Sequence, residues 1–104
     1  MIITTTNEIK GKEIKEYRGI IFGEVINGIE YGRDFAAAFK NIYGGRVTEY
    51  EEELVNARAD AIKEMMDRAT QVGANAIIGV HIDYETIGQM LMVVATGTAV
   101  VIEE

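Results

Sequence analysis

Cysteine and proline are absent from this chain of 104 residues. Without cysteine there is no disulfide bond, no thiolate metal site, no iron–sulfur cluster and no cysteine nucleophile. Only one histidine is present, and neither a nucleophile–base motif nor a paired-carboxylate motif accompanies it. The sequence therefore predicts that a single chain is not an enzyme, and it leaves catalysis only to a site built between subunits.

Positive charge is also scarce, since ten Lys and Arg residues stand against 17 Asp and Glu residues and the net charge is -7. Phosphate backbones and anionic lipids repel an acidic surface, and no Lys/Arg stripe with interleaved aromatic residues is found. We therefore expect neither nucleic acid nor a membrane as a partner. The chain also lacks a signal-peptide pattern and the roughly 20 apolar residues of a membrane span, which predicts a cytoplasmic protein.

What is present suits one folded domain over residues 1–104. Hydrophobic residues make up 48% and charged residues 26% of the chain, which are ordinary values for a globular protein. Eleven glycines supply the turns and element ends in place of proline.

The first third of the chain predicts strands. Ile2–Thr5 is expected to form a short strand, and a polar link follows over Asn7–Glu16. Arg18–Asn27 alternates as a second strand, interrupted by Gly19 and Gly23. Glycines inside a strand indicate a bulge or a close approach of another backbone.

Two helices are expected next. Asp34–Tyr43 carries an apolar stripe at helical spacing, and Gly44-Gly45 ends it. The second helix begins at Thr48, where Thr48 and Glu51 have capping-box spacing, and runs to about Val72 before Gly73. Its predicted buried face consists of Tyr50, Leu54, Ala57, Ala61, Met65, Ala69 and Val72, widened by Val55, Ile62 and Met66.

The chain closes with two further strands joined by a turn at Thr86–Gln89. Ala76–Glu85 alternates, so Ile78, Val80 and Ile82 are predicted on one face and Ile77, Gly79, His81, Asp83 and Glu85 on the other. Met90–Ile102 is apolar on both faces. A right-handed crossover makes strands 18–27 and 76–85 parallel, and the final strand fits between them. The predicted fold is a two-layer α+β domain, with one long and one short helix on a small mixed sheet.

Counting faces then predicts self-assembly. The two helices can cover only one side of the sheet. A strand with one face in water should alternate between apolar and polar residues, whereas the final strand is apolar on both faces. Its second face is therefore left without a partner. We expect a subunit interface there; the alternative is that the short helix or the N-terminal segment covers this face. The residues concerned are Met90, Met92, Val94, Val100 and Ile102.

Several short segments, in order along nearly the whole chain, resemble the YbjQ-like family of small bacterial proteins. They are Thr4-Thr5-Thr6, Gly23-Glu24-Val25, Arg33-Asp34, Gly44-Gly45-Arg46, Gly73-Ala74-Asn75-Ala76, Ile78-Gly79-Val80 and Gly97-Thr98-Ala99-Val100. The resemblance implies a dodecin-like β-α-β-β unit, a ring-shaped pentamer and heavy-metal binding. It carries no ligand motif onto numbered positions, and soft metals favour the thiolates that this chain lacks.

One candidate metal site comprises His81, Asp83 and Glu85. Residues at i, i+2 and i+4 share a strand face at steps of about 6.7 Å, and imidazole with carboxylate suits divalent ions such as zinc, manganese or iron. Because these steps exceed the spacing of ligands on one ion, we expect a second chain or a loop to contribute. The alternative is a solvated polar face.

Two weaker candidates accompany it. Met90 and Met92 share a strand face and carry soft thioethers, but packing also explains them. Gly44, Gly45 and Arg46 precede a helix N-terminus, which favours an anion; a hinge between two helices is the alternative.

The sequence thus leaves three functional hypotheses. The first is a homo-oligomer that holds a metal ion or small ligand at subunit junctions. The second is a structural or regulatory assembly subunit without a ligand, and the third is an enzyme with an intersubunit site.

Overall fold

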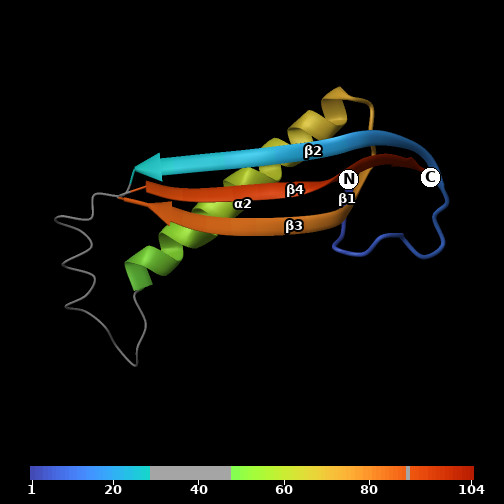
Figure 1. Cartoon of the computed structure of the whole chain (residues 1–104). Coiled ribbons are helices and arrows are strands. Elements are labelled where there is room, and N and C mark those ends of the chain that lie inside the picture. Colours follow the sequence, from blue (N-terminus) through green and yellow to red (C-terminus); the bar gives the residue numbers. More distant parts are fainter. Residues whose placement is uncertain (29–47, 89) are drawn as a thin grey trace.

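Four strands and one helix make up the described part of this computed structural model, which covers residues 1–28, 48–88 and 90–104. The sheet is mixed, with the strand order β1-β3-β4-β2, and α2 crosses one of its faces diagonally (Figure 1). The predicted α+β fold, with the C-terminal strand inside the sheet, is confirmed; the predicted short helix at 34–43 lies outside the described residues. The elements are β1 (Ile2–Ile3), β2 (Ile14–Gly28), α2 (Thr48–Gln71), β3 (Ala76–Ile87) and β4 (Met90–Ile102).

The order of the strands follows from a hairpin and a crossover. β4 is antiparallel to β3 on one side and to β2 on the other, so β2 and β3 run in the same direction, as predicted. Ile87 pairs with Met90, and Gly88 next to it has a φ of 60°, a conformation that glycine adopts without strain. The predicted turn at Thr86–Gln89 therefore began too early, because strand pairing continues through Ile87.

The predicted alternation along β3 is wrong at one point, where the strand carries a bulge. Its register against β4 shifts between Ile78 and His81, and Gly79 has a φ of 61°. The extra residue exchanges the faces, so Ile77 before the bulge and Val80 after it both pack in the core beneath α2. The backbone N–H groups of Gly79 and Val80 donate to the carbonyl oxygens of Thr6 and Thr4 at 2.8 and 3.0 Å.

The core lies between α2 and the sheet. Small and flexible side chains of the predicted helix face are at most 1% exposed and pack on alternate residues of β4. Val55 and Val72, which were predicted on this face, are 49% and 42% exposed, because the helix buries a narrower stripe than the sequence suggested. The buried set comprises Ala57, Ala61, Met65 and Ala69 of α2 and Leu91, Val93, Ala95 and Ala99 of β4.

Both glycines that interrupt β2 have the roles that were predicted for them. Gly19 follows a register shift after Tyr17 and has a φ of 104°. Gly23 lies under the helix, where an added Cβ would overlap the carbonyl oxygen of Ala61 and approach the backbone N of Met65 to 2.7 Å. The helix therefore rests directly on the backbone of β2 at this point.

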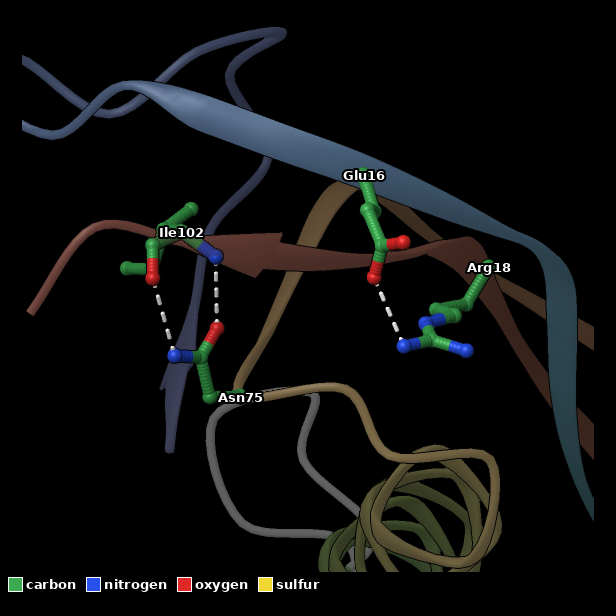
Figure 2. A network of polar contacts seen from close by, with 4 residues as sticks. All are labelled: Glu16, Arg18, Asn75 and Ile102. Carbon is green, nitrogen blue, oxygen red and sulfur yellow. Dashed lines mark hydrogen bonds and ion pairs between the residues drawn. The ribbon is translucent and has the colours of Figure 1, made fainter.

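Asn75 holds the C-terminal end of β4 in place (Figure 2). Its backbone N–H donates to the Val100 carbonyl at 3.0 Å. Its side chain bonds both backbone groups of Ile102: Nδ2 donates to the carbonyl oxygen at 3.0 Å, and the Ile102 N–H donates to Oδ1 at 2.7 Å. The amide of Asn75 thus replaces a paired strand residue at the end of the sheet.

Figure 2 also shows an ion pair on β2, where Arg18 Nη2 donates to Glu16 Oε2 at 2.7 Å, two residues away.

We expect Asn75→Ala to lower the free energy of unfolding by about 2 kcal/mol, because two partly buried hydrogen bonds are lost and each contributes about 1 kcal/mol. Urea denaturation measures this loss, and amide hydrogen exchange at Ile102 should accelerate. Asn56→Ala on α2 is the matched control and should leave stability unchanged or slightly higher, because alanine favours a helix. Equal stability of the Asn75 variant and the native protein would contradict this role.

Candidate functional site

The candidate site lies on the sheet face opposite α2, called the open face here. In the described part of the chain no helix covers this face (Figure 1). Residues of β4 alternate, so those that do not enter the core beneath α2 point to the open face together with their partners across the sheet. The open face therefore contains every other residue of β2 and β4 and, after the bulge, His81, Asp83, Glu85 and Ile87 of β3.

Large apolar side chains lie on the open face from Ile20, opposite Thr98, to the β3–β4 hairpin, and they form what we call the apolar patch. Five members are exposed by 43% to 73%, and Met92 and Val94 between them are half-buried. Pairing links them across the sheet, since Ile26 is opposite Met92 and Ile87 is opposite Met90. The five are Ile20, Phe22, Ile26, Ile87 and Met90.

The opposite end of the open face is covered by the chain itself. Val100 and Ile102 are 0% and 6% exposed and pack with Ile9 and Ile14 from the N-terminal part of the chain. Of the five predicted interface residues, these two are buried within the chain, as the alternative of a wrapping N-terminal segment proposed. Met90, Met92 and Val94 retain accessible surface, so the part of this face that the described residues leave uncovered is smaller than predicted.

His81 and Asp83 lie at the border of the apolar patch on β3, and they approach each other. His81 is opposite Thr96 and Asp83 is opposite Val94 on β4. His81 Nε2 lies 2.9 Å from Asp83 Oδ1, although residues two apart on a strand are separated by about 6.7 Å along the backbone. The two side chains therefore lean toward each other along the strand. Both remain mostly exposed, at 70% and 66%.

Glu85, the third predicted ligand, does not join this pair. It is exposed and lies opposite Met92, and no hydrogen bond or ion pair of the described residues connects it with His81 or Asp83. Among residues 1–28, 48–88 and 90–104, no group of three or more His, Asp or Glu side chains is arranged to hold a metal ion. A three-ligand site within this part of one chain is not formed.

Two further candidates were the methionine pair on the final strand and the predicted anion site. Met90 and Met92 are two residues apart on β4. Met90 is one of the five exposed members of the apolar patch, and Met92 is half-buried at its centre. The predicted anion site at Gly44, Gly45 and Arg46 lies outside the described residues. None of the helices that the structure describes is both long and apolar enough to cross a membrane.

Arg68 forms a network that the sequence did not reveal. From α2 it reaches around the edge strand β2, where Nη1 donates to the Phe22 carbonyl at 2.8 Å and lies 3.2 Å from Glu24 Oε1. Nη2 pairs with Glu64 one turn earlier on the helix. The only signal was a basic residue in the last helical turn, which helix-dipole preference also explains. This guanidinium satisfies an edge carbonyl and pairs with the carboxylate of Glu24, which lies opposite Val94.

Comparison with known proteins places the chain in a family. The family described as "Putative heavy-metal-binding" matches residues 1–103. A UPF0145 protein of Acetivibrio thermocellus is 62% identical over 99% of this chain and 100% of its own length. UPF0145 proteins of Clostridium kluyveri and Listeria ivanovii are each 58% identical over 99% of this chain and cover 100% and 96% of their own lengths.

A solved structure supports the fold independently. The crystal structure of a protein of unknown function from Pediococcus pentosaceus, assigned to the DUF74 family, superposes with a TM-score of 0.72 over 99% of this chain and 98% of that one. At 16% identity this likeness concerns the fold alone. The match over residues 1–103 and the identity with the UPF0145 proteins lead to one conclusion: this chain belongs to the YbjQ family of UPF0145 proteins.

Proposed function

We propose that this chain is the subunit of a homo-oligomer that buries its open face against a second copy and holds a metal ion or other small ligand at the subunit junction. The observation that carries the proposal is the apolar patch, whose five members are 43% to 73% exposed. A ring of five is the arrangement that the family resemblance favours.

The size of the apolar patch supports burial in an assembly. A fully exposed large apolar side chain presents roughly 200 Å², so the exposed fractions of the five residues amount to about 550 Å². The largest apolar patch of a typical monomer covers about 300–600 Å², and a stable interface buries about 800 Å² per partner. With the half-buried Met92 and Val94 at its centre, the patch approaches the area that a stable interface needs.

The charges around the apolar patch favour a second copy as the occupant. Interface centres are depleted of charge and have polar rims, and the carboxylates of Asp83 and Glu85 lie on the β3 side of the patch. Glu24, on the β2 side, is paired with Arg68, so its burial leaves no unpaired charge. A chain with a net charge of -7 repels its own copies elsewhere, and apolar contact at this face offsets that repulsion. Closed homo-oligomers are also the commonest assemblies of soluble proteins.

The family description and the His81–Asp83 pair support the ligand. Imidazole and carboxylate are ligands of divalent ions, and the pair lies at the border of the face that we assign to the interface. The alternative, an assembly subunit without a ligand, is favoured by one observation: the described residues contain no group of three or more metal-binding side chains. A tight site therefore needs further ligands from outside the described part of one chain, and we assign them to neighbouring chains.

Light scattering of the purified protein tests the assembly. We expect a mass that is a multiple of the 11.5 kDa chain, fivefold if the ring has five members, at micromolar concentration. Native mass spectrometry of the same sample reports the subunit number together with any retained ion. A monomer at micromolar concentration would overturn the proposal.

A further inference from the structure

We propose that His81 and Asp83 act as a two-point chelate for a divalent transition-metal ion, and that Cu²⁺ binds there more tightly than Zn²⁺. This inference rests on the proposed function, because it names the ion class and the two ligands that each subunit supplies. The sequence alone predicted three ligands too far apart for one ion, whereas the structure brings two of them together and leaves Glu85 out.

The distance between the two donor atoms carries the inference. Metal–ligand bonds to imidazole nitrogen and carboxylate oxygen are about 2.0–2.1 Å long, so two such donors at a right angle are about 2.9 Å apart. His81 Nε2 and Asp83 Oδ1 are separated by 2.9 Å. Right angles are typical of the tetragonal geometry of Cu²⁺, whereas tetrahedral Zn²⁺ places such donors about 3.4 Å apart. The hydrogen bond thus holds the two atoms at a spacing that fits Cu²⁺ once Nε2 releases its proton to solvent, whereas Zn²⁺ also requires an opening of about 0.5 Å.

Local structure aims the two side chains at the same point. The β3 bulge ends at His81, and bulges redirect the side chains that follow them. Beyond it the strand is regular, so His81 and Asp83 point to the same face, where their partners on β4 are the uncharged Thr96 and Val94. No described lysine or arginine pairs with Asp83, whose described ion-pair partner is His81. An arriving cation meets no fixed positive charge from a pairing residue, and both side chains are exposed in the single chain.

The residue inventory narrows the chemistry further. The chain has one histidine and no cysteine, so His81 is the one imidazole that it offers to an ion that prefers nitrogen to oxygen. Among divalent first-row ions, Cu²⁺ forms the most stable complexes with nitrogen and oxygen ligands. Two ligands from one chain give modest affinity, and we expect a dissociation constant in the micromolar range.

Titration of the intact, metal-free oligomer with Cu²⁺ alone tests the chelate. We expect calorimetry to show no more than one ion per chain and electron paramagnetic resonance to show nitrogen coupling. His81→Ala should abolish both signals. Asp83→Asn should weaken binding by at least about tenfold, since even outer-shell partners contribute 10- to 100-fold to metal affinity. Glu85→Gln is the matched control, with one carboxylate removed from the same strand face, and should bind as the native protein does. A parallel titration with Zn²⁺ should give the weaker affinity.

Two results would overturn the inference: Cu²⁺ binding that survives His81→Ala, or binding that Asp83→Asn leaves unchanged, which would mean that a lone surface imidazole captures the ion. Light scattering of the same variants separates this inference from the proposed assembly. An intact oligomer that fails to bind Cu²⁺ through the pair refutes the chelate and leaves the assembly standing, whereas a monomer refutes the assembly whatever the ion does.

Discussion

Replacing Gly23 by alanine is expected to lower the free energy of unfolding by about 3 kcal/mol, the upper end of the usual cost of overpacking. An added Cβ would overlap the backbone carbonyl of Ala61 and lie 2.7 Å from the backbone N of Met65. Backbone atoms of a helix cannot rotate away as a side chain can, so the whole helix must move off the sheet. That movement would loosen the contacts of Ala57, Ala61 and Met65 with β4.

Thermal unfolding followed by circular dichroism measures this effect, and the melting temperature should fall by roughly 10–20 °C. Gly11→Asn is the control, because a Cβ at Gly11 meets no atom within 4 Å and asparagine tolerates the positive φ found there. If Gly23→Ala melts within a few degrees of the native protein, the close contact between α2 and β2 does not exist in solution.

The double variant Ile20→Lys/Ile26→Lys is expected to convert the oligomer into monomers without unfolding the chain. Both side chains belong to the apolar patch and are 73% and 59% exposed in a single chain, so their replacement costs the isolated chain little. In an assembly each lysine would be buried without a partner, which costs several kcal/mol per charge. Light scattering should therefore show the 11.5 kDa chain mass, while circular dichroism keeps its native shape.

A matched control is Val55→Lys, which places the same charge on an apolar side chain that is 49% exposed on α2, away from the open face. It should leave the oligomer intact. An oligomer of native size in the double variant, or equal dissociation of the control, would show that the apolar patch is not the interface.

The residues of the candidate site could be predicted from the sequence, but the contacts between them could not. His81, Asp83 and Glu85 were selected because alternate strand residues share a face, and the structure places all three on the open face. Spacing along a backbone says nothing of side-chain rotation, so the 2.9 Å approach of His81 to Asp83 and the separation of Glu85 were not predictable. Arg68 was also missed, because its partners Phe22 and Glu24 are more than 40 residues away in the chain.

The sequence by itself determined the elements that depend on local periodicity. It predicted the long helix from Thr48 to within one residue of its observed end at Gln71, and it predicted β4 with its observed bounds, Met90–Ile102. Helical patterns repeat every three or four residues and strand patterns every two, and Gly73 stops the helix. Such signals are complete within a short stretch of chain.

Only the tertiary structure decided how these elements meet. The bulge before His81 exchanged the faces of β3, because Thr4 and Thr6 satisfy the N–H groups that a bulge removes from the ladder. Ile9 and Ile14 buried Val100 and Ile102, which reduced the open face to the apolar patch. Each of these outcomes joins residues more than 60 positions apart, and such contacts form because they bury apolar surface or satisfy backbone groups, neither of which leaves a repeat in the sequence.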